Sequence, residues 1–263
     1  GLLAEHGEDA KVLSGGHSLI PAMKFRLAEP AVIVDIGGIP KLREIREVGG
    51  KIALGALVTH YDVESSRLLA RKCPLLTELA PLIGDAQVRN RGTLAGSLAH
   101  ADPAGDWPAA MLALDAEIHL VGASGKRRVK AADFFVDLME TAVEPGEIVT
   151  EIRMSATGKS VAYVKFAQKA SGFAIAGVAA VLDRKKGTAK VGVTGVASTA
   201  FRATAVEREL KRQKRLTKKA IAGAAALAME GVDPMGDIHA SEEFRSHLAR
   251  VHTQRALELA ASR

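Results

Sequence analysis

One short segment constrains the fold of this chain more than any other. Residues 14–18 read SGGHS and lie between a short strand pattern at 11–14 and a short amphipathic helix pattern at 19–26. A continuous apolar strand follows at 31–36. Two strands joined through a helical crossover run parallel to each other. The order therefore predicts a βαβ unit at the start of the chain, with the glycine turn at the point where the first strand meets the helix.

The chemistry of this turn suits an anion. Gly15 and Gly16 permit positive φ and remove side chains that would keep a ligand away from the backbone. The amides of Gly16, His17 and Ser18 would lie at a helix N-terminus, where free N–H groups favour a phosphate, and the Ser18 hydroxyl would add a donor. A tight turn with Ser18 as the helix N-cap explains the same residues, so both interpretations stay open.

A second segment, residues 93–97 (TLAGS), places Thr93 and Ser97 on either side of Gly96. We interpret it as another glycine turn, so that the two turns could face each other and hold one diphosphate. Charge-assisted hydrogen bonds of this kind contribute about 1.5–3 kcal/mol each. Neither a GxxxxGK[ST] nor a GxGxxG pattern occurs in the chain, which argues against P-loop and Rossmann nucleotide binding.

The residues after the second segment are HADPAGD, at 100–106. Asp106 could accept hydrogen bonds from a ribose or a ring nitrogen, or it could cap a buried helix that the pattern predicts at 109–114. His100 could carry a proton, although a histidine in a polar loop is more typical as an ordinary hydrogen-bonding residue.

Composition narrows the function classes. The net charge is +6 with only 4% aromatic residues, which leaves few platforms for stacked bases and argues against nucleic-acid binding. The basic clusters at 126–130 and 183–187 are expected at hairpin tips, and the cluster at 211–219 joins two helical stretches. We interpret all three as solvated faces, with docking of an acidic partner as the second reading.

Cysteine and histidine usage excludes several kinds of site. The single cysteine, Cys73, permits neither an internal disulfide nor a cysteine-ligated cluster held by this chain alone. The eight histidines are scattered without metal-ligand spacing, so we expect no metal site. No apolar run is long enough to span a bilayer, and the cytoplasm is the expected compartment. No N-cap precedes Leu2, so we expect part of the N-terminal portion to be missing.

The chain divides near residues 155–160 (SATGKS), which we interpret as a linker. Before it lies an α/β portion, residues 1–155. After it, in residues 160–263, three apolar strand patterns at 161–167, 175–183 and 189–196 predict an antiparallel sheet. Helical patterns at 203–212, 217–229 and 241–261 complete this second portion, so the fold class is α+β.

Three stretches together resemble a known family: SGGHSLIPAMKFRLAEP followed by VDI, then IALGALVTHYDVESS, then QVRNRGTLAGSLAHADPAGDWPA. They are similar to the FAD-binding medium subunits of the molybdenum hydroxylases, a family that includes the medium chain of aerobic carbon monoxide dehydrogenase and the FAD domain of xanthine dehydrogenase. The stretches at 193–203 and 237–258 resemble its C-terminal part. The resemblance implies a vanillyl-alcohol-oxidase-type (PCMH) FAD-binding domain of two α/β subdomains. A C-terminal domain with a three-stranded antiparallel sheet and helices would follow.

The resemblance also implies which residues bind FAD. The two segments would hold the diphosphate, Asp106 the adenosine region, and Val149 the apolar wall, with Lys165 acting electrostatically and Phe173 lying near the flavin ring. The full set of implied cofactor-binding residues is Ser14, Gly15, Gly16, His17, Ser18, Thr93, Leu94, Ala95, Gly96, Ser97, Asp106, Val149, Lys165 and Phe173.

Two positions depart from the family pattern. Ala95 stands where the family usually has glycine; if that residue needs positive φ, the strain would be about 1–2 kcal/mol. Phe173 stands where a tyrosine can occur, which removes a hydroxyl and keeps the ring.

In such a subunit no residue of this chain is expected to act as a catalytic acid, base or nucleophile, because the redox chemistry belongs to the cofactor. The implied partners are a molybdenum-cofactor large subunit, where substrate is oxidised, and a [2Fe-2S] small subunit that delivers electrons to FAD. The implied assembly is a dimer of heterotrimers, and an external molecule accepts the electrons. Two alternatives remain: a free-standing FAD-dependent oxidoreductase of the same superfamily, and a non-enzymatic nucleotide-binding interaction module.

Overall fold

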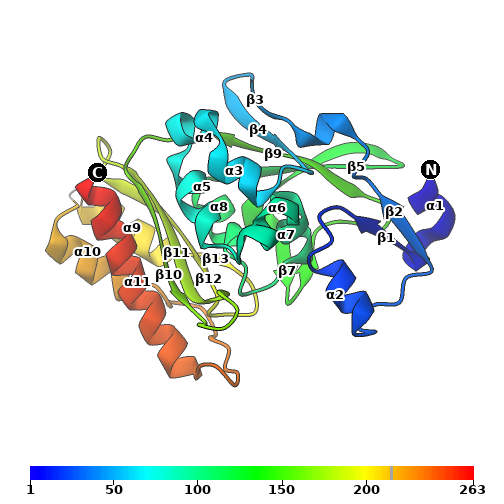
Figure 1. Cartoon of the computed structure of the whole chain (residues 1–263). Helices are drawn as coiled ribbons and strands as arrows, with labels where there is room; N and C mark the ends of the chain where they lie inside the picture. Colours follow the sequence, from blue (N-terminus) through cyan, green and yellow to red (C-terminus); the bar gives the residue numbers. More distant parts are fainter. Residues whose placement is uncertain (214–215) are drawn as a thin grey trace.

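The computed structural model describes residues 1–213 and 216–263. The chain forms a small N-terminal unit, a central unit built on a five-stranded sheet, and a C-terminal unit built on a four-stranded sheet (Figure 1). The chain termini lie at opposite ends of the molecule. Part of the basic cluster predicted at 211–219 lies outside the described residues. Among the described residues, no helix has the length and apolar character needed to cross a bilayer.

The N-terminal unit has the predicted βαβ order. Its strands pair in parallel, with Ala10 opposite Val32 and Leu13 opposite Asp35. Alternate residues of the second strand are exposed although the strand is largely apolar, because this sheet has only two strands. The elements are α1 (Leu2–His6), the 3₁₀ turn Gly7–Asp9, β1 (Ala10–Leu13), α2 (Leu19–Lys24) and β2 (Val32–Asp35).

The central sheet is antiparallel, with strand order β3-β4-β9-β5-β6. Its first hairpin turns at Gly49-Gly50, where the glycine pair in the sequence indicates a turn between two strands, and both glycines have positive φ. The basic cluster at 126–130 was expected at a hairpin tip, and this was wrong: it runs along β6, the edge strand, where alternate side chains reach solvent. The strands are β3 (Ile45–Val48), β4 (Lys51–Gly55), β5 (Glu117–Gly122), β6 (Gly125–Lys130) and β9 (Ile148–Ser155).

Short helices connect the strands of this unit and bury its core. Thr59 is a residue type that caps helices, and here it is the N-cap of α3 and forms a reciprocal capping box with Asp62. The helix predicted at 109–114 begins earlier, at Trp107. The helices are α3 (His60–Ser65), α4 (Arg67–Lys72), α5 (Pro74–Leu79), α6 (Ala86–Arg91), α7 (Leu94–His100) and α8 (Trp107–Ala113). Further short elements are the 3₁₀ turns Pro40–Arg43, Ala80–Leu82 and Ala131–Asp133, and the hairpin β7 (Phe135–Asp137) and β8 (Glu140–Thr141).

The C-terminal sheet contains the three predicted antiparallel strands and a two-residue fourth strand at its edge. Helix α11 packs along one face of this sheet (Figure 1), and α8 of the central unit packs against β11 and β12. The second predicted helix is shorter than expected and ends at Ala225. The elements are β10 (Val161–Ala167), β11 (Ala174–Asp183), β12 (Thr188–Thr194), β13 (Phe201–Arg202), α9 (Thr204–Gln213), α10 (Lys218–Ala225) and α11 (Glu242–Ser262).

The C-terminal sheet approaches α8 at backbone contact distance. A Cβ at Gly192 of β12 would overlap the carbonyl oxygen of Ala109. Beside this contact, Oγ1 of Thr194 lies 2.9 and 2.7 Å from the carbonyl oxygens of Pro103 and Gly105, which share its one hydroxyl proton. The seam between the central and C-terminal units is therefore tightly packed, and it fixes the loop 103–105 that leads into Asp106.

This packing predicts the effect of Gly192→Ala. The added methyl has no space against the Ala109 carbonyl, so the free energy of unfolding should fall by about 1–3 kcal/mol, as overpacking does elsewhere. The matched control is Gly223→Ala on the exposed side of α10, where a Cβ meets nothing. That change should stabilise the chain by about 0.5–1 kcal/mol through helix propensity. Urea unfolding of both variants measures the difference. An equal change in the free energy of unfolding for the two variants would contradict tight packing between the central and C-terminal units.

Candidate functional site

The principal cleft lies between the N-terminal unit and the central unit and has a volume of about 950 Å³. This is near the upper end of small-molecule sites, so it suits a ligand of dinucleotide size. One wall comes from β1 and the turn at 14–18. The opposite wall comes from residues 92–97, the loop at 143–149 and Phe173. Gly16 and Gly96 therefore share one cleft although they are far apart in sequence.

Direct contacts join the two predicted segments. The hydroxyls of Ser14 and Thr93 lie 3.0 Å apart and form a hydrogen bond. The ring of His17 contacts the carbonyl oxygen of Gln87 at 3.3 Å. A Cβ at Gly15 would overlap the carbonyl oxygen of Arg91. Gly15 is thus needed for close approach of two backbones, and this contact sets one end of the cleft.

The first turn presents unused donors. Gly16 has φ of +78°, the conformation that favours glycine. A Cβ there would face Ile20, not open cleft, so the turn needs glycine for its own conformation and packing. Within the described residues, no hydrogen bond engages the amides at 15–18. Ser18 occupies the N-cap position of α2, but its side chain makes no capping bond, so its hydroxyl also remains available.

The second segment is not a glycine turn, and that interpretation was wrong. Thr93 is the N-cap of α7, and its hydroxyl oxygen accepts a hydrogen bond from the amide of Gly96 at 3.0 Å. Ala95 lies within the helix and has no positive φ, so the strain considered for it does not arise. Among the described residues, the amides of Leu94, Gly96 and Ser97 are all bonded within the chain. The amides of Thr93 and Ala95 have no such partner, and both residues line the cleft, so this segment leaves backbone donors to a ligand.

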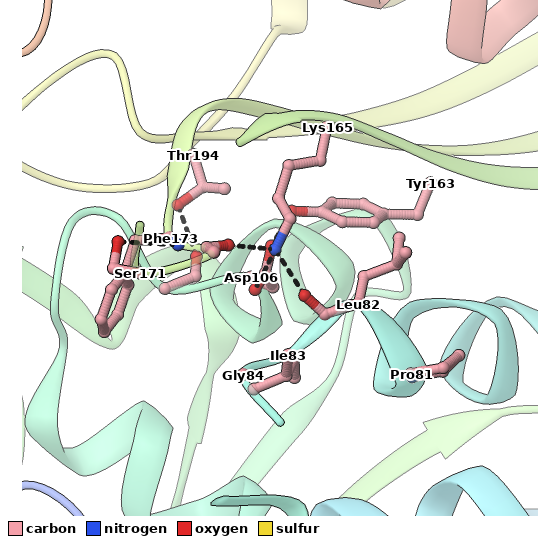
Figure 2. Close-up of polar contacts among 12 residues, drawn as sticks. Pro81, Leu82, Ile83, Gly84, Asp106, Tyr163, Lys165, Ser171, Phe173 and Thr194 are labelled. Atoms are coloured by element: carbon pink, nitrogen blue, oxygen red, sulfur yellow. Dashed lines mark hydrogen bonds and ion pairs between the residues drawn. The ribbon is translucent and has the colours of Figure 1, made fainter. Parts of the chain in front are cut away.

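Asp106 does not cap α8 with its side chain. Its carboxylate is 5% exposed and pairs with Lys165, whose Nζ lies 3.0 Å from it (Figure 2). The Tyr163 hydroxyl donates a second hydrogen bond to the same carboxylate. Asp106 and Lys165 are thus brought together beneath the cleft, and neither is among the residues that line it.

Burial controls the ionisation of this cluster. It raises the pKa of Asp106, against the opposing charge of Lys165 and the hydrogen bond from Tyr163. Burial also raises the pKa of Tyr163 well above its usual value, and the Asp106 charge adds to this effect. Tyr163 therefore remains a hydroxyl donor, and the cluster is arranged to hold structure, since its groups already satisfy one another.

The other predicted residues divide between cleft and core. Phe173 lines the cleft and is 48% exposed, while Val149 lines it from β9 and is nearly buried. Leu94 is fully buried in the core of the central unit and does not line the cleft. The predicted residues that do line it are Ser14, Gly15, Gly16, His17, Ser18, Thr93, Ala95, Gly96, Ser97, Val149 and Phe173.

Several lining residues were not predicted from the sequence. Ile83, His60 and the segment 143–148 all line the cleft. The turn signal Pro145-Gly146 could have pointed to the last of these, whereas Ile83 carries no local signal. His100, considered as a proton carrier, also lines the cleft. Among the described residues, no group of histidine, cysteine and carboxylate side chains is arranged to hold a metal ion.

His60 is a neutral histidine at the floor of the cleft. It is 5% exposed, and its Nδ1 accepts a hydrogen bond from Trp107 Nε1 at 3.0 Å. The proton of the neutral ring therefore lies on Nε2. Burial lowers the pKa of His60 from 6.5 to about 4, and the positive charges of His17 and Arg89 add to this effect.

This lowered pKa predicts a pH dependence of stability. As the pH falls below 6.5, the unfolded chain protonates this histidine and the folded chain does not until about pH 4. The free energy of unfolding should therefore fall by about 2 kcal/mol from His60 alone between about pH 7 and pH 5. Urea unfolding of the wild type and of His60→Gln at both pH values measures this, and an identical pH dependence in the two proteins would contradict it.

Comparison with known proteins accounts for the whole chain. Residues 1–155 match the family described as the FAD binding domain in molybdopterin dehydrogenase, and residues 161–260 match the CO dehydrogenase flavoprotein C-terminal domain. The carbon monoxide dehydrogenase medium chain of Hydrogenophaga pseudoflava is 39% identical over all of this chain and 93% of its own length. The 6-hydroxypseudooxynicotine dehydrogenase complex subunit alpha of Paenarthrobacter nicotinovorans is 36% identical over all of this chain and 90% of its own length.

Solved structures agree with this assignment. A chain of the carbon monoxide dehydrogenase from Hydrogenophaga pseudoflava, in a form that lacks the Mo-pyranopterin moiety, superposes with a TM-score of 0.95 and 41% identity. The match covers 99% of this chain and 92% of that one. The resemblance seen in the three sequence stretches is confirmed: the chain belongs to the family of FAD-binding medium subunits of the molybdenum hydroxylases.

Proposed function

We propose that this chain is the FAD-carrying electron-transfer subunit of a molybdenum-containing dehydrogenase. The observation that carries the proposal is one cleft lined both by the first turn, whose amides are free, and by Ala95, whose amide is also free. Backbone donors at helix N-termini suit a diphosphate. When bound, FAD supplies the redox chemistry, and the protein supplies binding and orientation.

The residues present fit FAD. The cleft has the size for a dinucleotide, and its donors come from both sides. Gly16, His17 and Ser18 would hold one side of the diphosphate and Ala95 the other, while the apolar side chains of Val149, Phe173 and Ile83 would pack against flat rings. The neutral His60 offers a ring N–H and no positive charge. Asp106 and Lys165 would contribute from beneath the cleft.

The names of the relatives support a place in a larger enzyme, because they describe a medium chain and a subunit of a complex. We propose that a [2Fe-2S] subunit delivers electrons to this chain and that a molybdenum-cofactor subunit oxidises the substrate. A dimer of heterotrimers and the cytoplasm are the proposed assembly and compartment. The names of the two relatives refer to different substrates, carbon monoxide and 6-hydroxypseudooxynicotine, and we propose that the large subunit sets the substrate.

Flavin content tests the cofactor assignment. The purified chain should carry, or take up from added FAD, close to an equimolar amount of the cofactor and show a flavin absorption spectrum. A folded chain that binds no FAD would contradict the proposal. Copurification with molybdenum-containing and iron–sulfur subunits then distinguishes the electron-transfer subunit from a free-standing oxidoreductase, which would purify alone and turn over a substrate.

The close approach of the backbones at Gly15 and Arg91 predicts the effect of Gly15→Ala. The new methyl would push the first turn away from the Arg91 carbonyl and widen the diphosphate site. Overpacking of about 1–3 kcal/mol corresponds to an FAD affinity reduced about 5- to 150-fold. Gly38→Ala is the matched control, since a Cβ there meets nothing, and it should bind FAD as the wild type does. FAD titration of both apo proteins measures this, and unchanged affinity in Gly15→Ala would refute the role of this close approach.

A further inference from the structure

We propose that Lys165 is a positioning residue that fixes two apolar lining residues on one wall of the cleft, Ile83 and Phe173, instead of acting on the cofactor by its charge. The proposal rests on the assignment of the cleft to FAD. Lys165 lies on β10, and its side chain is 5% exposed. Its ammonium group bonds to three partners: the carbonyl oxygen of Leu82 at 2.7 Å, the carbonyl oxygen of Gly172 at 2.7 Å, and Asp106 at 3.0 Å.

The two carbonyl groups explain what the lysine does. Leu82 immediately precedes Ile83, and Gly172 immediately precedes Phe173; both following residues line the cleft. A carbonyl group and the next residue's amide share one planar peptide unit. The single ammonium group therefore holds both the peptide plane that leads into Ile83 and the one that leads into Phe173. Figure 2 shows Lys165 Nζ between these two segments, with Asp106 beside it.

The three partners use all the donors of an ammonium group, since it has three N–H bonds. No donor then remains for a phosphate or a flavin oxygen. Asp106 also neutralises the charge, so little net field reaches the cleft. Both facts argue against the electrostatic role that the family resemblance implies for Lys165, and in favour of a role through Ile83 and Phe173.

The turn 81–84 is held from a second side by another cation. Nη1 of Arg89 lies 3.2–3.4 Å from the carbonyl oxygens of Pro81, Ile83 and Gly84, and its Nε bonds to Glu64 at 2.8 Å. Among the described residues, Arg89 forms no hydrogen bond or ion pair with the loop that carries Phe173. The two cations therefore differ in reach: Arg89 secures Ile83 alone, and Lys165 secures Ile83 and Phe173 together.

The loop that carries Phe173 needs such an anchor. Phe173 is half exposed, and the loop turns at Gly172, which has φ of +76°. Backbone bonds close it locally between Gln168 and Phe173, and the amide of Ala174 reaches Ala104 at 3.1 Å. The bond from Lys165 to Gly172 ties this turn to β10. The same ammonium group bonds to Leu82 and Asp106 of the central unit, so one side chain links the segment of Phe173 to that of Ile83.

A double-mutant cycle on FAD affinity tests the proposal. The apo forms of the full chain with Lys165→Met, Phe173→Ala and both changes are titrated with FAD. If Lys165 acts through Phe173, Lys165→Met should weaken FAD binding about tenfold or more in the wild type but less than about threefold when Phe173 is already alanine. Losses that multiply in the double variant would show an independent, direct action and would overturn the proposal.

Arg89→Met provides the matched control, because it also removes a cation from the 81–84 turn. The loss of FAD affinity in Arg89→Met should be smaller when Ile83 is already alanine, and should be unchanged when Phe173 is already alanine. The loss in Lys165→Met should be smaller in both backgrounds. The same pattern for both cations would overturn the proposal. The flavin spectrum gives a further readout: the resolved shoulders of the visible band should blur in Lys165→Met because the ring packs less closely, and an unchanged band would count against the proposal.

Removing Lys165 alone leaves Asp106 buried without its charge partner, which can prevent folding. The paired change Lys165→Met with Asp106→Asn removes both charges. FAD affinity of this pair, measured with and without Phe173→Ala, gives the same double-mutant cycle. Wild-type protein that binds no FAD would instead refute the function proposed for the cleft. Wild-type binding with multiplying losses in every cycle would refute only the positioning role of Lys165.

Discussion

The structure of the cleft depends on the close approach of the backbone at Gly15 to the backbone at Arg91, secured by the hydrogen bond between Ser14 and Thr93. The N-terminal unit has only two strands and two short helices, and of its side chains Ala10 and Ile36 are the apolar ones that are buried. A two-stranded unit of this size is marginal by itself. Its position is set where its turns meet the central unit, and that seam is also where the ligand would bind. Occupancy of the cleft and docking of this unit should therefore stabilise each other.

The far wall of the cleft is built in a different way. There the central and C-terminal units share a buried polar cluster of Asp106, Tyr163 and Lys165, in which each group satisfies another. Such clusters are favourable only when complete. The result is a rigid wall that carries Ile83 and Phe173, opposite a wall that is held by a few turn contacts. The C-terminal unit thus takes part in shaping the cleft although most of its core lies elsewhere.

Local signals in the sequence predicted most helices and strands, because caps and turns act over few residues. Thr59, Gly49-Gly50 and the strand–turn–helix order at the start are examples. The same local reading mistook the start of α7 for a glycine turn, since a capping threonine and a turn-flanking threonine look alike. The partners of Asp106 lie 57 and 59 residues away, and no pattern in one sequence encodes such contacts. The role of Ile83 was missed for the same reason, and the cofactor itself came from the family resemblance, not from the turns alone.

Hydrogen–deuterium exchange of the apo chain and of the FAD-loaded chain tests the central claim most directly. If main-chain donors from both sides hold one diphosphate, FAD should slow exchange in the peptides that contain residues 15–18 and, in the same titration, in the peptide that contains Ala95. The edge strand β6 should exchange equally in both forms. Protection on one side only, or protection of neither segment when FAD is bound, would contradict the account of a dinucleotide held across the seam.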